Sequence, residues 1–100
     1  ETTTANETVK ITVLRGDGPA LAARRALAEY LKSSPEELMA GQKVFIEEIL
    51  RQKITDQVLT VGDQVKFTFD DIGTAIEQSK QLTEFQLQKW EEYAKKVKFN

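Results

Sequence analysis

The hydrophobic residues of this chain recur with a period of two in two short stretches and with helical spacing in four longer ones. Residues Val9 to Leu14 and Gln64 to Phe69 alternate apolar and polar positions, which is the pattern of strands with one buried face. Because these are the two good strand candidates, we expect them to pair, and to run antiparallel. A lone two-stranded sheet is marginally stable, so the helices should cover it.

The first helix is predicted directly after a Gly-Asp-Gly turn at residues 16–18. The two glycines supply backbone freedom on either side of Asp17. Pro19 suits the first helical position, where its missing N–H costs nothing. The residues that follow are rich in Ala and Leu, which favour helix, and their apolar positions form one face as far as Leu31.

Three further helices are predicted from their start signals. Ser34 and Pro35 have the types expected at the N-cap and the first position of a second helix. Gly41 interrupts that helix at a cost of about 1 kcal/mol relative to Ala. Asp70 is the expected N-cap of a third helix, and Thr83 that of a fourth. The inward positions expected along the three helices are Leu38, Phe45, Ile46, Ile49 and Leu50, then Ile72, Ala75, Ile76 and Ser79, then Leu87, Trp90, Ala94 and Val97.

The composition narrows the classes of function. One hundred residues suit a single domain with one core. With 14 Lys and Arg against 16 Asp and Glu the net charge is -2, which argues against a nucleic-acid surface. His and Cys are both absent, so the chain lacks the commonest general base, the thiol nucleophile and the preferred transition-metal ligands. We therefore expect no enzyme, no catalytic residue, no metal site and no cofactor.

The remaining patterns concern the surface and the ends of the chain. No apolar run approaches the roughly 20 residues of a membrane helix, so no membrane span is expected in this segment. Adjacent acids such as Glu47 and Glu48 point in different directions on a helix, and we expect them on solvated faces. Residues 1–7 are polar and Thr-rich, as in a tail or the end of a linker. Because the chain starts at Glu1 rather than Met, we expect an excised domain or a processed product.

Two stretches resemble the two ends of a LysM domain. Ile11-Thr-Val-Leu-Arg-Gly-Asp17, followed at once by an Ala/Leu helix, is similar to the family's opening strand, Gly-Asp-Thr turn and helix. Thr60-Val-Gly-Asp-Gln-Val-Lys-Phe67 is similar to its closing Pro-Gly-Gln-x-Leu-x-Ile strand. The chain departs from the family pattern at Gly18, which stands in place of Thr, at Val61, in place of Pro, and at Asp63, which interrupts the Gly-Gln pair.

A second stretch, Ala40-Gly-Gln-Lys-Val-Phe-Ile46, matches the closing strand more closely letter by letter. Closing the domain there leaves too few residues for a second helix and a loop, and the helical spacing from Phe45 to Leu50 argues against a strand. We therefore prefer the later match. The second helix is then longer than in LysM domains, and the family's Asn-rich loop after it is missing.

The resemblance implies an α+β fold in which a two-stranded antiparallel sheet packs against two helices in the order βααβ. It covers residues 8–69, and residues 70–100 would form a C-terminal helical pair packed on that core. LysM domains bind GlcNAc-containing glycans such as peptidoglycan and chitin, usually within exported proteins. The resemblance thus implies a non-catalytic, carbohydrate-binding module of a larger protein in the cell envelope or outside the cell. The glycan contacts that it implies are Gly16, Asp17 and Gly18, together with Val58, Leu59, Thr60, Val61 and Gly62.

Two alternatives stand beside this interpretation. The two segments to which the resemblance assigns glycan contacts, residues 16–18 and 58–62, also fit simple tight turns at strand ends. The chain could then be a structural or protein-interaction domain that keeps the fold and has lost sugar binding. Trp90 and Tyr93 on the last helix would form its contact surface for a protein partner, because aromatic residues concentrate at interfaces. Trp90, in a stripe with Leu87, Ala94 and Val97, would otherwise dock the last helix onto the domain.

Overall fold

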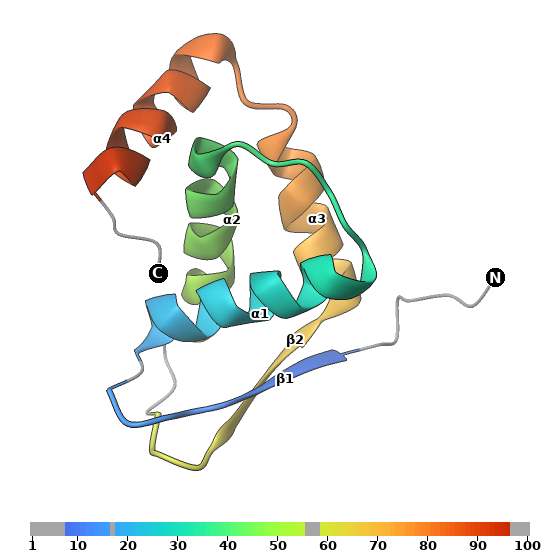
Figure 1. The fold of residues 1–100 in the computed structure, drawn as a ribbon, viewed down its shortest axis with the longest axis vertical. Coiled ribbons are helices and arrows are strands. Elements are labelled where there is room, and N and C mark those ends of the chain that lie inside the picture. Colours follow the sequence, from blue (N-terminus) through green and yellow to red (C-terminus); the bar gives the residue numbers. More distant parts are fainter. Residues whose placement is uncertain (1–7, 17, 56–58, 97–100) are drawn as a thin grey trace, which may run out of the picture.

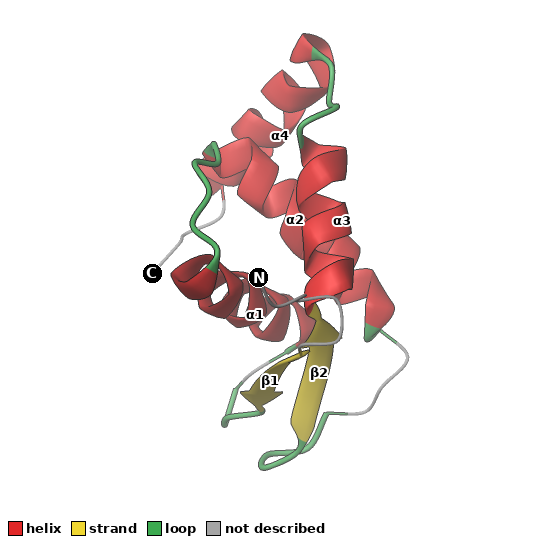
Figure 2. Cartoon of the chain, turned by 90° about the vertical axis from the view of Figure 1, so that its right-hand side faces the viewer, coloured by secondary structure: helices red, strands yellow, loops and turns green. Residues whose placement is uncertain are grey.

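The computed structural model describes residues 8–16, 18–55 and 59–96. The elements follow one another as β1 (Thr8–Thr12), α1 (Pro19–Ser33), α2 (Ala40–Lys53), β2 (Gln64–Thr68), α3 (Phe69–Ser79) and α4 (Glu84–Lys96). The sheet lies at one end of the molecule and the helices lie on one side of it (Figures 1 and 2). The expected α+β class, with one antiparallel two-stranded sheet, is confirmed.

The sheet has one buried and one exposed face. Val9 pairs with Phe67 and Ile11 with Val65, and all four side chains are buried against the helices. The predicted alternation and the antiparallel pairing are therefore both correct. On the exposed face the register is Thr8 with Thr68, Lys10 with Lys66 and Thr12 with Gln64.

Helix α1 begins at Pro19, as predicted, and lies across β1. Its buried positions are mostly alanines, which allow a close approach to the sheet and to α2. The helix ends at Ser33, and Ser34 donates its backbone N–H to the carbonyl of Tyr30. The prediction that Ser34 starts the second helix is therefore wrong, because this residue instead closes the first.

Helix α2 begins at Ala40, where the side-chain oxygen of Gln42 accepts a hydrogen bond from Met39 N–H. Leu38, expected on the helix, precedes it and packs against the core from an irregular segment. The helix is central to the fold, because it contacts α1, α3 and α4 (Figure 1). Ile46 and Leu50 are its fully buried core residues.

Strand β2 passes into α3 without a loop. Thr68, the last residue of the strand, is also the N-cap of the helix, and its hydroxyl oxygen accepts the backbone N–H of Asp71. The prediction of Asp70 as N-cap is therefore wrong. Asp70 and Asp71 instead lie in the first turn, where a negative charge favours the positive end of the helix dipole. The expected inward residues of α3 are all buried, and they are Ile72, Ala75, Ile76 and Ser79.

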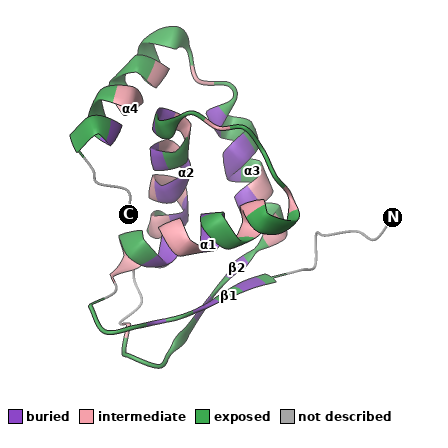
Figure 3. Cartoon of the chain, in the orientation of Figure 1, coloured by how far each residue is buried: buried purple, intermediate pink, exposed green. Residues whose placement is uncertain are grey.

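Helix α4 starts with the predicted cap, Thr83, which forms reciprocal hydrogen bonds with Gln86. Each of the two side chains accepts a hydrogen bond from the backbone N–H of the other residue. The helix packs on α2 at the far end of the molecule from the sheet (Figure 1), and most of its surface is exposed (Figure 3). Ala94 is buried, and Leu87 and Trp90 are half-buried, as the stripe predicts. Val97 lies outside the described residues.

Candidate functional site

The structure brings the two predicted turn segments together at one end of the sheet. Val13 donates its N–H to the Asp63 carbonyl at 2.8 Å and accepts the N–H of Gly62 at 2.9 Å. These two bonds continue the ladder beyond both strands, so the turn after β1 lies beside the turn before β2 (Figure 2). Six of the eight residues that the resemblance implied are described here, and Asp17 and Val58 lie outside the described residues.

The turn before β2 is held by its own hydrogen bonds. Asp63 N–H donates to the Thr60 carbonyl at 2.9 Å, and the Asp63 carboxylate accepts Thr60 N–H at 3.1 Å. Gly62 has φ +95°, the positive value that a type II turn requires at its third residue. The N–H groups of Thr60 and Gly62 are thus used within the protein. The groups of this turn that remain for a ligand are therefore its other backbone N–H and C=O groups.

The turn after β1 leaves backbone donors open. Gly16 has φ +87°, whereas Gly18 is extended at φ -119°, so the conformational freedom of glycine is required only at Gly16. Neither glycine N–H donates to any residue in the part of the chain that the structure describes. Gly18 is the N-cap of α1 but has no side chain to cap it, so among the described residues the first helical turn has no side-chain cap.

Two apolar side chains flank the paired turns. Leu14 is 53% exposed and Val61 is 64% exposed. Neither turn contains an aromatic residue. Tyr30 belongs to the last turns of α1, where its ring packs 4.9 Å from that of Phe69. Among the described residues, the turns therefore expose backbone donors and aliphatic surface but no aromatic ring.

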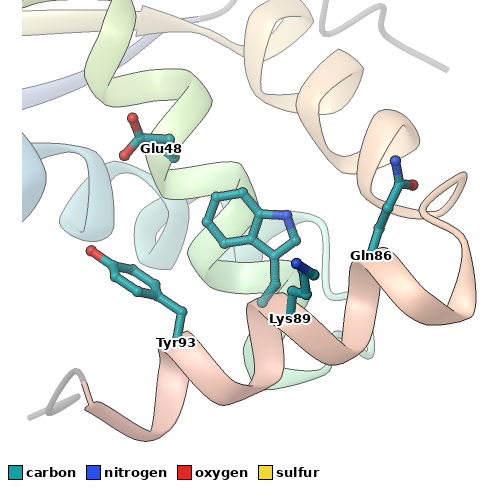
Figure 4. Close-up of a pocket in the computed structure, with 5 residues that line it drawn as sticks. Glu48, Gln86, Lys89 and Tyr93 are labelled. Carbon is teal, nitrogen blue, oxygen red and sulfur yellow. The ribbon is translucent and has the colours of Figure 1, made fainter.

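A concave region lies between α2 and α4. It is an open depression of about 410 Å³, lined by Glu48, Gln86, Lys89, Trp90 and Tyr93 (Figure 4). The Trp90 ring lies 5.6 Å from that of Phe45 and 6.0 Å from that of Tyr93, and both contacts are edge-to-face. Trp90 thus takes part in docking α4 onto α2 and also lines the depression. Tyr93 is 52% exposed.

Two adjacent carboxylates of α2 have opposite electrostatic environments. Burial raises the pKa of Glu47, although Arg24 at 3.3 Å partly opposes the shift. Hydrogen bonds from Arg51 lower the pKa of Glu48, which also accepts a bond from Gln52. The expectation that both acids are solvated is wrong for Glu47, because the α1–α2 contact covers it. Sequence alone carried no signal for this burial, since it depends on how the two helices cross.

The chain was also compared with known proteins, and its described residues were considered for metal sites and membrane-spanning helices. No protein-family model, curated protein or solved structure matches the chain. Over residues 8–16, 18–55 and 59–96, no group of three or more acidic, His or Cys residues could hold a metal ion. None of the helices described here has the length and apolar character needed to cross a membrane.

Proposed function

We propose that this chain is a non-catalytic binding module of LysM-like type, which recognises GlcNAc-containing cell-wall glycan as part of a larger exported protein. The observation that carries the proposal is the pairing of the two turns through Val13. It brings segments that are far apart in the sequence to one end of the sheet, and they are the segments that the resemblance implies. The exported location rests on the resemblance.

The chemistry of the paired turns suits an acetamido sugar. The acetamido carbonyl is a hydrogen-bond acceptor, and the N–H groups of Gly16 and Gly18 are donors with no partner among the described residues. The acetamido methyl group is apolar, and Leu14 and Val61 supply exposed apolar surface beside those donors. The φ value of Gly62 and the hydrogen bonds of Asp63 hold one side of the site in shape before binding, which lowers the entropy cost of association.

The test is a titration with tetra-N-acetylchitotetraose in which the backbone amide signals are monitored by NMR. We expect saturable shifts at Gly16, Gly18 and residues 59–62. Cellotetraose, which lacks the acetamido groups, should leave these amides unmoved. A flat titration with the acetylated sugar at millimolar concentration would reject the proposed function.

A substitution in the first turn tests the location. Gly18→Val should weaken binding and preserve the fold, because a Cβ at this extended residue meets nothing within 4 Å and would cover the exposed turn. Thr74→Val, on the exposed face of α3, is the matched control that adds the same side chain elsewhere. Equal affinities of the two variants would place the sugar away from the turns.

A further inference from the structure

We propose that the depression between α2 and α4 is a second saccharide subsite, in which Trp90 and Tyr93 stack against a sugar ring. The ligand class rests on the proposed function, but the residues are different from those of the turns. The subsite supplies what the turns lack, an aromatic surface against which the apolar face of a pyranose packs.

The two aromatic rings form a fixed corner. Trp90 is held edge-to-face by Phe45, with interplanar angles of 73° to Phe45 and 90° to Tyr93. Because Trp90 is half-buried and Tyr93 is half-exposed, the corner is anchored on one side and open on the other. Rings that are already held in place lose little conformational freedom on binding.

Polar groups of three kinds surround these rings. Glu48 lies on α2, across the depression from Gln86, Lys89 and Tyr93 of α4 (Figure 4). Arg51 and Gln52 hold the Glu48 carboxylate in place, so its remaining acceptor capacity is oriented before a ligand arrives. An aromatic surface beside a carboxylate, an amide and an ammonium group suits a ligand with one apolar face and hydroxyls around its edge. A pyranose ring has that distribution.

A smaller cleft extends from the depression to the first turn of α1. It has a volume of about 180 Å³ and shares Glu48 and Tyr93 with the depression. Its other polar lining residues are Arg24, Glu47 and Arg51, and it reaches Ala20 in the first turn of α1. Gly18 is the N-cap of that same helix, so the cleft ends close in sequence to the turn after β1. A glycan chain of several sugars could follow this cleft.

The size of the apolar area favours a sugar over a protein partner. A stable protein interface buries about 800 Å² on each partner around an apolar centre. The exposed residues of α4 other than Tyr93 and Phe85 are polar or charged, and Phe85 does not line the depression. The exposed aromatic surface of the corner is thus the size of a small ligand.

Trp90 makes the subsite directly observable, because it is the only tryptophan of the chain. In the same titration with tetra-N-acetylchitotetraose, we expect the indole N–H signal to shift and the tryptophan fluorescence to change with saturation. Shifts of the turn amides without any change at Trp90 would overturn the subsite and leave the proposed function intact. A change at Trp90 with unmoved turn amides would support the subsite and reject binding at the turns. A silent titration would reject both.

Substitutions on α4 separate stacking from a structural role. Tyr93→Ala should weaken binding by about twofold to tenfold, the range for loss of one aromatic contact. Tyr93→Phe should keep most of the affinity, since the ring remains. Gln88→Ala is the control, because it truncates an exposed side chain of the same helix outside the depression. Equal affinities of Tyr93→Ala and Gln88→Ala, with both variants folded by circular dichroism, would overturn the subsite.

Discussion

The backbone N–H of Gly41 donates a hydrogen bond to the Glu91 carboxylate, with a distance of 2.8 Å to Oε2. Gly41 lies in the first turn of α2, so the carboxylate also faces the positive end of that helix. A Cβ at this position would lie 2.8 Å from the Glu91 backbone nitrogen and 2.9 Å from Oε2. The absence of a side chain on Gly41 thus allows α4 to approach α2 this closely.

Gly41→Ala should therefore destabilise the protein. The added methyl group must displace the backbone of α4, and overpacking of this kind costs about 1–3 kcal/mol. That exceeds the roughly 1 kcal/mol that Ala gains over Gly through helix propensity. Urea unfolding measures the difference in the free energy of unfolding, and the Trp90 signals should report the displacement of α4.

Gly73→Ala is the matched control for this substitution. Gly73 is also helical, but the nearest atom to a Cβ there is Tyr30 Oη at 3.5 Å, an ordinary contact. We expect this variant to gain up to about 1 kcal/mol from helix propensity. If both alanine variants were stabilised, the close approach at Gly41 would have no energetic consequence.

The two adjacent carboxylates of α2 should give opposite pH dependences. The pKa of Glu47 is raised above the usual 4.5, so between 4.5 and the raised value the native state binds more protons and stability falls as pH rises. The pKa of Glu48 is lowered, so its contribution is fully present above pH 4.5 and is lost as pH falls through the lowered value.

Urea unfolding at a series of pH values checks these signs. Relative to the unsubstituted chain, Glu47→Gln should become more stable as the pH rises from 4.5, because it removes the cost of a buried charge. Glu48→Gln should become less stable as the pH rises toward 4.5, because it removes the Arg51 partner. Parallel pH profiles for all three proteins would contradict the assigned environments.

Lys10 and Lys66 face each other across the exposed side of the sheet. Like charges directly opposite are destabilising, so Lys66→Glu should raise the free energy of unfolding by roughly 0.2–1 kcal/mol. High salt should shrink this gain, since the pair is exposed to solvent. The double variant Lys10→Glu/Lys66→Glu restores repulsion and should lose the gain. A gain that persists in the double variant would point to strand propensity instead of charge.

Substitution by alanine should change the free energy of unfolding differently at the two glycines Gly62 and Gly18 of the paired turns. Gly62 has a positive φ, and an L-residue there costs about 1–2 kcal/mol, so Gly62→Ala should lower the free energy of unfolding by that amount. Gly18 is extended and has open space around it, so Gly18→Ala should leave stability nearly unchanged. Denaturant unfolding distinguishes them, and equal losses would mean that backbone conformation does not control this end of the sheet.

The periodic patterns of the sequence were sufficient for the two strands, their pairing and the inward face of α3. Val9 and Ile11 alternate with polar residues because only one face of the sheet is covered. Ile72, Ala75 and Ile76 repeat with the helical period because α3 buries one side. These features follow from local geometry. The structure places the two turns side by side, and both the glycan and its contacts at these turns stay predictions.

The failures came where tertiary contacts outweighed local signals. Ser34 and Pro35 match a helix start, but an N-cap contributes only about 1 kcal/mol. In the structure this segment stays irregular while Leu38 packs against the core. The burial of Glu47 depends likewise on the crossing of α1 and α2. The depression at Trp90 depends on the docking of α4, which the helical spacing alone does not orient.

The direct passage from β2 into α3 has a consequence for how this chain can change in length. Each residue added to a helix start turns the helix by about 100°. One residue inserted between Thr68 and Phe69 would rotate Ile72 and Ile76 away from the core or force the cap to unwind. The α1–α2 connection, which is irregular and largely exposed, would absorb the same insertion at its surface. Among relatives of this chain, length variation should therefore collect in the α1–α2 connection and spare the strand-to-helix junction.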